Sequence, residues 1–153
     1  PIVQIKITNI TATGKYAVGG ILGCGTAKID NCTVTNPIIT ANSEHGVAGA
    51  AVGIAVEESE LSNINITSEN SENYGVFSDG LAGGIVAINS GLLKDSSVKN
   101  ITVKTTIENT PDNDEEATLN IYSGMCADAI QVQYLDMYEN CTQENVNVIA
   151  GEA

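Results

Sequence analysis

The chain reads Gly19-Gly20-Ile21-Leu22-Gly23 and, six residues later, Ile29-Asp30-Asn31-Cys32-Thr33-Val34, and this pair of segments recurs. The first is a run of small residues with two apolar positions, and the second carries an apolar triplet. The runs recur as Gly49-Ala50-Ala51-Val52-Gly53, Gly83-Gly84-Ile85-Val86-Ala87 and Ser123-Gly124-Met125-Cys126-Ala127. The triplets are Ile2/Ile5/Ile7, Ile29/Cys32/Val34, Leu61/Ile64/Ile66, Leu93/Ser96/Val98 and Tyr138/Cys141/Gln143. Their first members lie 27, 32, 32 and 45 residues apart. This spacing predicts stacked repeats, because one repeat cannot bury its own apolar face.

The triplets follow the rules of a β-strand. Apolar residues alternate with polar ones in Ile5-Lys6-Ile7, Cys32-Thr33-Val34 and Ile64-Asn65-Ile66, as in a strand with one buried face. Corners rich in Gly, Asn and Ser separate these strands. A left-handed hexapeptide helix would need a six-residue apolar repeat that we do not find, and a β-sandwich would not explain the recurring spacing.

We therefore predict an all-β fold, a single-stranded parallel β-helix (solenoid) of about four to five coils in one domain. The coils are expected near residues 1–28, 29–60, 61–92, 93–137 and 138–153. The chain opens directly on the first triplet, so we expect it to be a fragment of a longer solenoid.

Stacking at the ~4.8 Å strand spacing predicts ladders of like side chains. The expected ladders are Ile29/Leu61/Leu93, Val34/Ile66/Val98 and Leu22/Val52/Val86. Asn31, Asn63 and Asn140 each precede the middle residue of a triplet, and Asn tolerates left-handed backbone angles. We expect a corner of the coil at these positions.

Composition narrows the classes of partner. Six Lys and Arg against 19 Asp and Glu give a net charge of −13, which opposes binding to nucleic acid or anionic lipid. No apolar run reaches the ~18 residues of a membrane span, so we expect no membrane insertion. Aromatic residues make up only 4% of the chain, which predicts a core of aliphatic and small side chains.

The small-residue runs pose a problem of burial. Both members of Ile21-Leu22 and of Ile85-Val86 are apolar, although one of each pair should face outward from a half-buried strand. We expect the outward row to be Ile21, Ala51, Ile85 and Met125, or its register partner. A neighbouring domain, a loop of this chain or a binding partner would cover it.

Val18-Gly19-Gly20-Ile21-Leu22-Gly23, followed by Ile29-Asp30-Asn31-Cys32-Thr33-Val34, resembles the GLUG repeat, a G-L-x-G core followed by a short strand. The resemblance covers about Gly14–Val103 and is clearest in the first copy. It implies a bacterial surface protein of the kind that includes adhesin-like proteins and the non-catalytic N-terminal regions of immunoglobulin-A-cleaving metallopeptidases. No catalytic residue belongs to the repeat.

The cysteines and the single histidine do not form a recognisable reactive site. Among the four cysteines, only Cys24–Cys32 and Cys126–Cys141 are close enough within a coil to pair. Free thiols are favoured, because Cys32, Cys126 and Cys141 occupy apolar ladder positions. The absence of C-x-x-C argues against zinc, and His45 is expected in a surface loop.

Acidic residues offer one metal candidate. The run containing Asp112, Asp114, Glu115 and Glu116 is the densest set of oxygen ligands and could hold Ca²⁺, although a solvated acidic loop is the favoured interpretation. We expect no other cofactor. Apart from Asp30 and Asp95 near corners, the acids Asp30, Asp79, Asp95, Asp128 and Asp136 do not repeat at a common outward position, so we predict that the chain is not an enzyme.

The predicted function is a non-enzymatic structural or adhesion module of an exported bacterial cell-surface protein, located outside the cell. It would serve as a stalk or display scaffold beside neighbouring domains of a longer chain. Loops at Thr40–Gly46, Glu69–Asp79 and Glu108–Ala117 would contact host protein or glycan. The alternatives are a non-catalytic substrate-positioning region of a surface peptidase and a degenerate polysaccharide-active β-helix.

Overall fold

The computed structural model describes residues 2–106 and 138–150, which form β-strands and no helix. The strands lie in four sheets, and all strand pairs of the described residues are parallel. The largest sheet contains β1 (Ile2–Thr8), β5 (Lys28–Thr35), β9 (Glu60–Thr67), β13 (Leu92–Lys94), β14 (Ser97–Lys99), β16 (Tyr138–Glu139) and β17 (Thr142–Glu144). The second contains β2 (Thr11–Gly14), β6 (Ile38–Ala41), β10 (Gly75–Ser78), β15 (Thr102–Thr105) and β18 (Asn147–Ala150). Two three-stranded sheets complete the fold: β3 (Ala17–Gly19), β7 (Val47–Gly49) and β11 (Leu81–Gly83), and β4 (Leu22–Gly25), β8 (Val52–Ala55) and β12 (Val86–Asn89).

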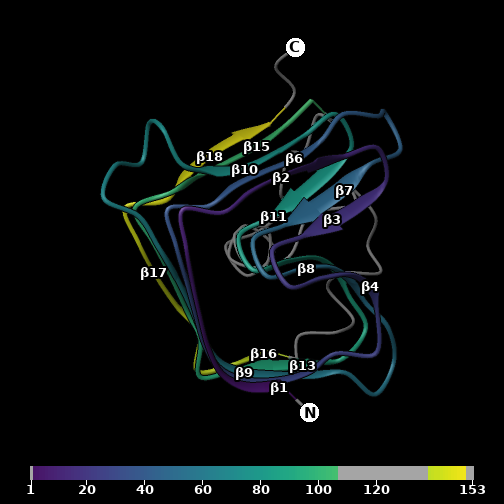
Figure 1. The fold of residues 1–153 in the computed structure, drawn as a ribbon, viewed down its shortest axis with the longest axis vertical. Helices are drawn as coiled ribbons and strands as arrows, with labels where there is room; N and C mark the ends of the chain where they lie inside the picture. The colour runs from purple at the N-terminus through teal and green to yellow at the C-terminus, as the bar shows by residue number, and fades with distance from the viewer. Residues whose placement is uncertain (1, 107–137, 151–153) are drawn as a thin grey trace.

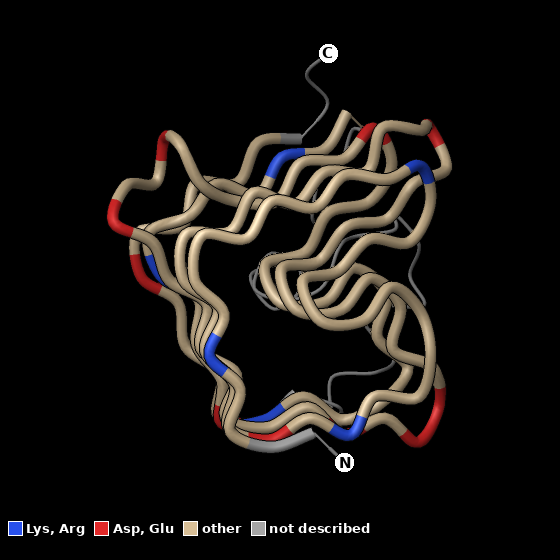
Figure 2. Tube along the Cα trace, viewed as in Figure 1, with Lys and Arg blue, Asp and Glu red and all other residues tan. Residues whose placement is uncertain are grey.

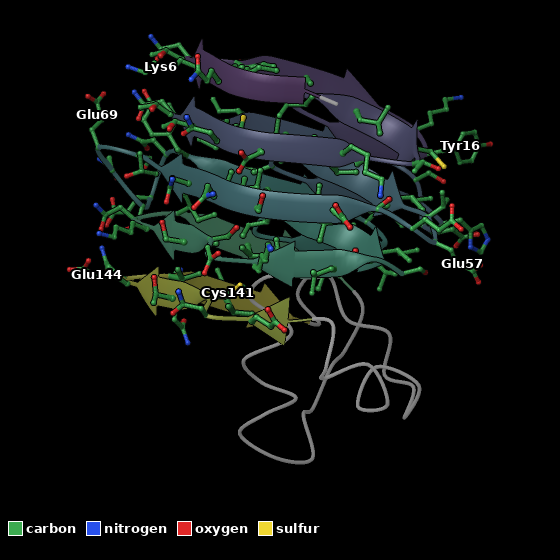
Figure 3. All side chains as sticks on the ribbon, turned by 90° about the horizontal axis from the view of Figure 1, so that it is seen from below. Lys6, Tyr16, Glu57, Glu69, Cys141 and Glu144 are labelled. Atoms are coloured by element: carbon green, nitrogen blue, oxygen red, sulfur yellow. The ribbon has the colours of Figure 1, made fainter. Side chains whose placement is uncertain are left out.

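This arrangement confirms the predicted parallel β-helix. Each of the first three circuits, which end at β4, β8 and β12, visits the four sheets in turn, and the next circuit lies beside it in the same order (Figure 1). Seen from the side, the coils form layers that run from the first strands, in purple, to the last described strands, in yellow (Figure 3).

Like residues lie directly over one another. Ile29 pairs with Leu61 and Leu61 with Leu93. The second row pairs Val34, Ile66 and Val98, and the third pairs Leu22, Val52 and Val86. Apart from Leu22, which is half-buried, these side chains are buried.

Residues with left-handed backbone angles explain why the first two apolar residues of each triplet lie three positions apart in the sequence. Asn31 and Asn63 have φ values of 60° and 52°, and both lie inside long strands. A left-handed residue interrupts the strand's alternation, so the apolar residues on either side of it both point inward. The same slot holds Gln4, Asp95 and Asn140, also with positive φ. A second set of left-handed residues follows at Asn9, Asn36, Asn100 and Asn145.

The small-residue runs fold into the interior of the coil. The chain turns back on itself between β3 and β4, between β7 and β8, and between β11 and β12, and these turns point into the ring made by the other strands (Figure 1). We call this feature, residues 17–25, 47–55 and 81–89, the infold. It carries no charged residue, and the charged residues of Figure 2 lie on the outer walls and loops.

Close packing at the infold requires small residues. A Cβ added at Gly49 would lie 2.1 Å from the carbonyl oxygen of Val52, and one at Gly53 would lie 2.4 Å from that of Gly23. Successive turns are also hydrogen bonded, as from the Gly20 N–H to the Ala50 carbonyl oxygen (3.1 Å). The glycine-rich runs are therefore packing elements.

Of the three covers expected for the row of Ile21, Ala51 and Ile85, the structure shows the chain itself, and the row lies inside the coil instead of facing outward. Ala51 and Ile85 are both 0% exposed and belong to the main core cluster, and Ile21 packs against that cluster. The infold lies inside the ring, so the chain's own strands surround residues that would face outward from a simple wall. Met125 of the predicted row lies outside the described residues. A second, smaller cluster at the infold is built on Val47, Leu81 and Ala87.

Candidate functional site

The outer wall of the largest sheet carries carboxylate and amide side chains that link neighbouring coils. Asp30 Oδ1 accepts hydrogen bonds from Asn63 Nδ2 and Ser62 Oγ, both at 2.8 Å. The hydrogen bond from Asn63, followed by that from Ser62, lowers the pKa of the Asp30 carboxyl. A similar link joins the last two described coils at the left-handed corner position, where Asn140 Nδ2 donates to Asp95 Oδ1, also at 2.8 Å.

The second set of left-handed residues forms a further row of amides. Asn36 Nδ2 donates to Asn9 Oδ1, and Asn145 Nδ2 donates to Asn100 Oδ1, both at 3.0 Å. The third coil departs from this row, because the segment Ser68–Tyr74 is inserted before β10 and the Glu69 N–H donates to Asn36 Oδ1 (3.0 Å). Both rows hold coils together and use up polar groups that could otherwise meet a ligand.

The predicted metal and catalytic candidates do not assemble into a site where the structure describes them. Asp112, Asp114, Glu115 and Glu116 lie outside the described residues. Within residues 2–106 and 138–150, no three His, Cys, Asp or Glu side chains lie close enough to hold a metal ion. His45 stands on an exposed turn, 82% exposed at its side chain, with Nε2 3.4 Å from Oε1 of neighbouring Glu44.

The described cysteines, Cys24, Cys32 and Cys141, are free thiols. Cys32 is buried in the row between Ile5 and Ile64, and burial raises the pKa of its thiol to about 11. Burial also raises the pKa of Cys141, whereas Cys24 is exposed. The remaining cysteine, Cys126, lies outside the described residues.

Two of the three predicted recognition loops are described, and both are partly strand. Thr40–Gly46 begins in β6, and Glu69–Asp79 contains all of β10. Loop-forming residues in these segments include the turn at Ser43–His45 and the residues from Glu69 to Tyr74. Glu108–Ala117 lies outside the described residues.

A hollow of about 250 Å³ lies over the second sheet, between these segments. Strands β6, β10 and β15 and the residues that follow them line it. Its lining includes Thr40, Asn42, Phe77, Asp79, Lys104 and Thr106. The predicted loops lie in this region. Only the strand register of the structure, however, shows that Phe77 lies between Thr40 and Lys104 on neighbouring strands.

A second hollow, more polar, lies over the largest sheet. Asn63, Asn65, Asp95, Ser97, Lys99 and Thr142 are among its lining residues. Two of these side chains already form a hydrogen bond with each other, because Ser97 Oγ donates to Asn65 Oδ1 at 2.6 Å.

The described residues contain no helix that is long and apolar enough to cross a membrane. In comparisons with known proteins, no curated protein and no solved structure is significantly similar to the chain. The family model of the GLUG motif matches residues 16–40, which confirms the predicted resemblance in its clearest copy. The motif is a non-catalytic repeat found in bacterial surface proteins. The stretch from Tyr16 to Thr40, which spans one turn of the infold and the long strand after it, is thus a GLUG motif.

Proposed function

We propose that this chain is a non-catalytic structural module of an exported bacterial surface protein, a stalk or display scaffold that works outside the cell. The observation that carries the proposal is the stacking of buried aliphatic side chains in register over three successive coils. Ile29, Leu61 and Leu93 form one such row, each almost or entirely inaccessible to solvent. A solenoid of this kind gains stability with each coil added, and it holds its ends at a fixed separation.

The distribution of chemistry supports a non-enzymatic role. Charged groups lie on the outer walls and loops (Figure 2), and the pairs they form there, such as Lys28 with Glu60 and Lys99 with Glu144, are exposed to solvent. Two side-chain hydrogen bonds on the wall of the largest sheet, Asn63 to Asp30 and Asn140 to Asp95, join neighbouring coils. The GLUG motif, a repeat without catalytic residues, agrees with this interpretation.

The partners we propose are the neighbouring domains of a longer chain and, through the outer surface, a host protein or glycan. The net charge of −13 argues against nucleic acid and against insertion into an anionic membrane. The scaffold needs no cofactor, because stacked side chains and inter-coil hydrogen bonds hold it together. Ca²⁺ at Asp112, Asp114, Glu115 and Glu116 is a separate proposal, tested by calcium titration of the protein and its Asp112→Asn variant.

Two measurements test the scaffold proposal. Antibodies raised against the recombinant chain should label intact cells of the source bacterium, and trypsin added to intact cells should remove that label. Label confined to lysed cells would contradict export. Pulling on the purified chain through terminal handles should give a distinct unfolding force. Extension at low force, as for a Gly/Ser linker of equal length, would contradict a rigid spacer.

A further inference from the structure

We propose that the hollow over β6, β10 and β15 binds one neutral sugar unit of a glycan, with the ring of Phe77 as its packing surface. The inference rests on the proposed contact with a glycan and names its site and sugar class, whereas the scaffold role itself requires no ligand. The site is inferred from the position of Phe77, from the polar groups around it and from the charge of the chain.

Phe77 is the aromatic residue in an outward-facing row whose other members are not aromatic. The outward positions of the second sheet read Thr13, Thr40, Phe77, Lys104 and Ile149 in register. The neighbouring Val76 is fully buried in the core, whereas Phe77 is only half-buried and lines the hollow. The core of the described residues contains no aromatic side chain, so this ring does not serve the packing of the solenoid. A partly exposed ring is a surface against which the C–H face of a pyranose can pack.

Polar groups stand at one end of that ring. Asn42 and Asp79 follow the last residues of β6 and β10, and the Asp79 N–H donates to the Ala41 carbonyl oxygen (3.0 Å). Backbone pairing thus brings an amide and a carboxylate to the same end of two neighbouring strands. The Thr106 hydroxyl donates to the Asp79 carbonyl oxygen (2.7 Å) and fixes the third side of the hollow. Amide and carboxylate groups beside an apolar surface match the hydroxyls and C–H face of a sugar.

Size and charge select the ligand. At about 250 Å³ the hollow is smaller than the roughly 300–1,000 Å³ of drug-sized pockets, so it suits a single ring. Lys104 and Asp79 offset each other locally. The net charge of −13 repels acidic sugars at long range, which leaves neutral sugars as the favoured class.

Saturation-transfer NMR on the full chain tests the proposal with three probes: methyl β-galactoside, methyl N-acetyl-β-glucosaminide and N-acetylneuraminic acid. We expect transfer to at least one neutral probe and none to the acidic one. Phe77→Thr, which installs the residue found at Thr13 and Thr40 of the same row, should weaken binding on the order of tenfold. Tyr16→Thr, at an aromatic residue that is 67% exposed elsewhere, should leave binding unchanged.

Each other result overturns the proposal. These results are no transfer to either neutral probe, transfer to the acidic probe alone, or equal binding by Phe77→Thr. If Phe77→Thr does not fold, Asp79→Asn and Lys104→Thr take its place, and unchanged binding in both would be equally decisive. The scaffold proposal stands or falls on surface labelling and unfolding force, so a negative result here leaves it untouched.

Discussion

The side-chain amide of Asn63 donates a hydrogen bond of 2.8 Å to the carboxylate of Asp30, which lies 33 residues earlier in the chain and one coil away. The neighbouring Ser62 hydroxyl donates to the same oxygen. Asn63 is left-handed and Asp30 precedes left-handed Asn31, so the corner geometry places an amide over a carboxylate. A corner therefore both bends the chain and joins successive coils.

This link predicts a pH-dependent contribution to stability. The hydrogen bonds to its charged form hold the pKa of Asp30 below its ordinary value of 3.8. The stability they contribute is therefore present above that value and is lost as the pH falls through the lower, folded-state pKa. Asp30→Asn should lower the urea midpoint at pH 7, and the gap to wild type should narrow at about pH 2.5.

Glu57→Gln, on the exposed turn between β8 and β9, is the matched control for this experiment. A surface substitution of this kind should stay within about 0.5 kcal/mol of wild type at either pH. An Asp30→Asn gap of the same size at both pH values would show that the carboxylate's charge does not matter to the link.

The infold makes a second prediction, at Ile85. Its side chain is fully buried in the main core, so Ile85→Ala should lower the free energy of unfolding by about 2–5 kcal/mol. Ile85→Asp should prevent folding, because it buries a charge without a partner. Ile88→Ala, three residues later in β12 but only half-buried, should lose clearly less. Denaturant unfolding of the three variants provides the measurement, and equal losses at Ile85 and Ile88 would rule out a buried infold.

Gly49 tests the close approach of the coils. An alanine there would place its Cβ 2.1 Å from the Val52 carbonyl oxygen and 2.8 Å from the Val86 Cα. Both are backbone atoms that cannot move aside, so we expect Gly49→Ala to lose about 1–3 kcal/mol of stability. The control is Gly14→Ala, whose Cβ would meet the side-chain methyl of Val18 at 3.0 Å and whose register partner is already Ala41. Thermal unfolding should separate the two variants, and a Gly49→Ala protein as stable as Gly14→Ala would contradict tight stacking at the infold.

Periodicity was enough to predict the walls of this solenoid and not enough to predict the infold. The recurrence of Ile29 at Leu61 and Leu93 reports stacking directly, and Asn31 and Asn63 mark a corner because few other residues adopt left-handed angles easily. The small-residue runs recur as well, but their spacing does not show that the chain reverses its direction within each run. The trace of this reversal in the sequence is the absence of charge over residues 17–25, 47–55 and 81–89, which indicates segments enclosed by the chain itself.

The candidate sugar site was beyond sequence reasoning for a related reason. Thr40 and Asp79 lie within segments predicted to carry recognition. Their proximity to Lys104 depends on the exact register of β6, β10 and β15, which includes the inserted residues Ser68–Tyr74. A spacing argument that assumes equal coils cannot supply that register.

The thiols provide a chemical test of the layers. Cys24 is exposed, whereas Cys32 is buried and its pKa is raised to about 11, so little thiolate forms there at neutral pH. Iodoacetamide should modify Cys24 in the native protein and reach Cys32 only after denaturation, as peptide mass spectrometry would show. Cys24→Ser should remove the rapid modification at that site. Native labelling of Cys32 at the rate of Cys24 would place it outside the core.

Removal of one whole coil is the most demanding prediction. Ile29 and Leu61 occupy the same slot, so a deletion of residues 29–60 joins Lys28 to Leu61 and brings the first coil onto the third without a change of register. We expect this shortened chain to keep its β-sheet circular dichroism and to unfold cooperatively, with a smaller denaturant m-value because less surface is exposed on unfolding. Deletion of residues 29–61 differs by one residue and reverses the direction of every side chain in the joined strand, so it should not fold. If both deletions behave alike, the coil is not the unit from which this molecule is built.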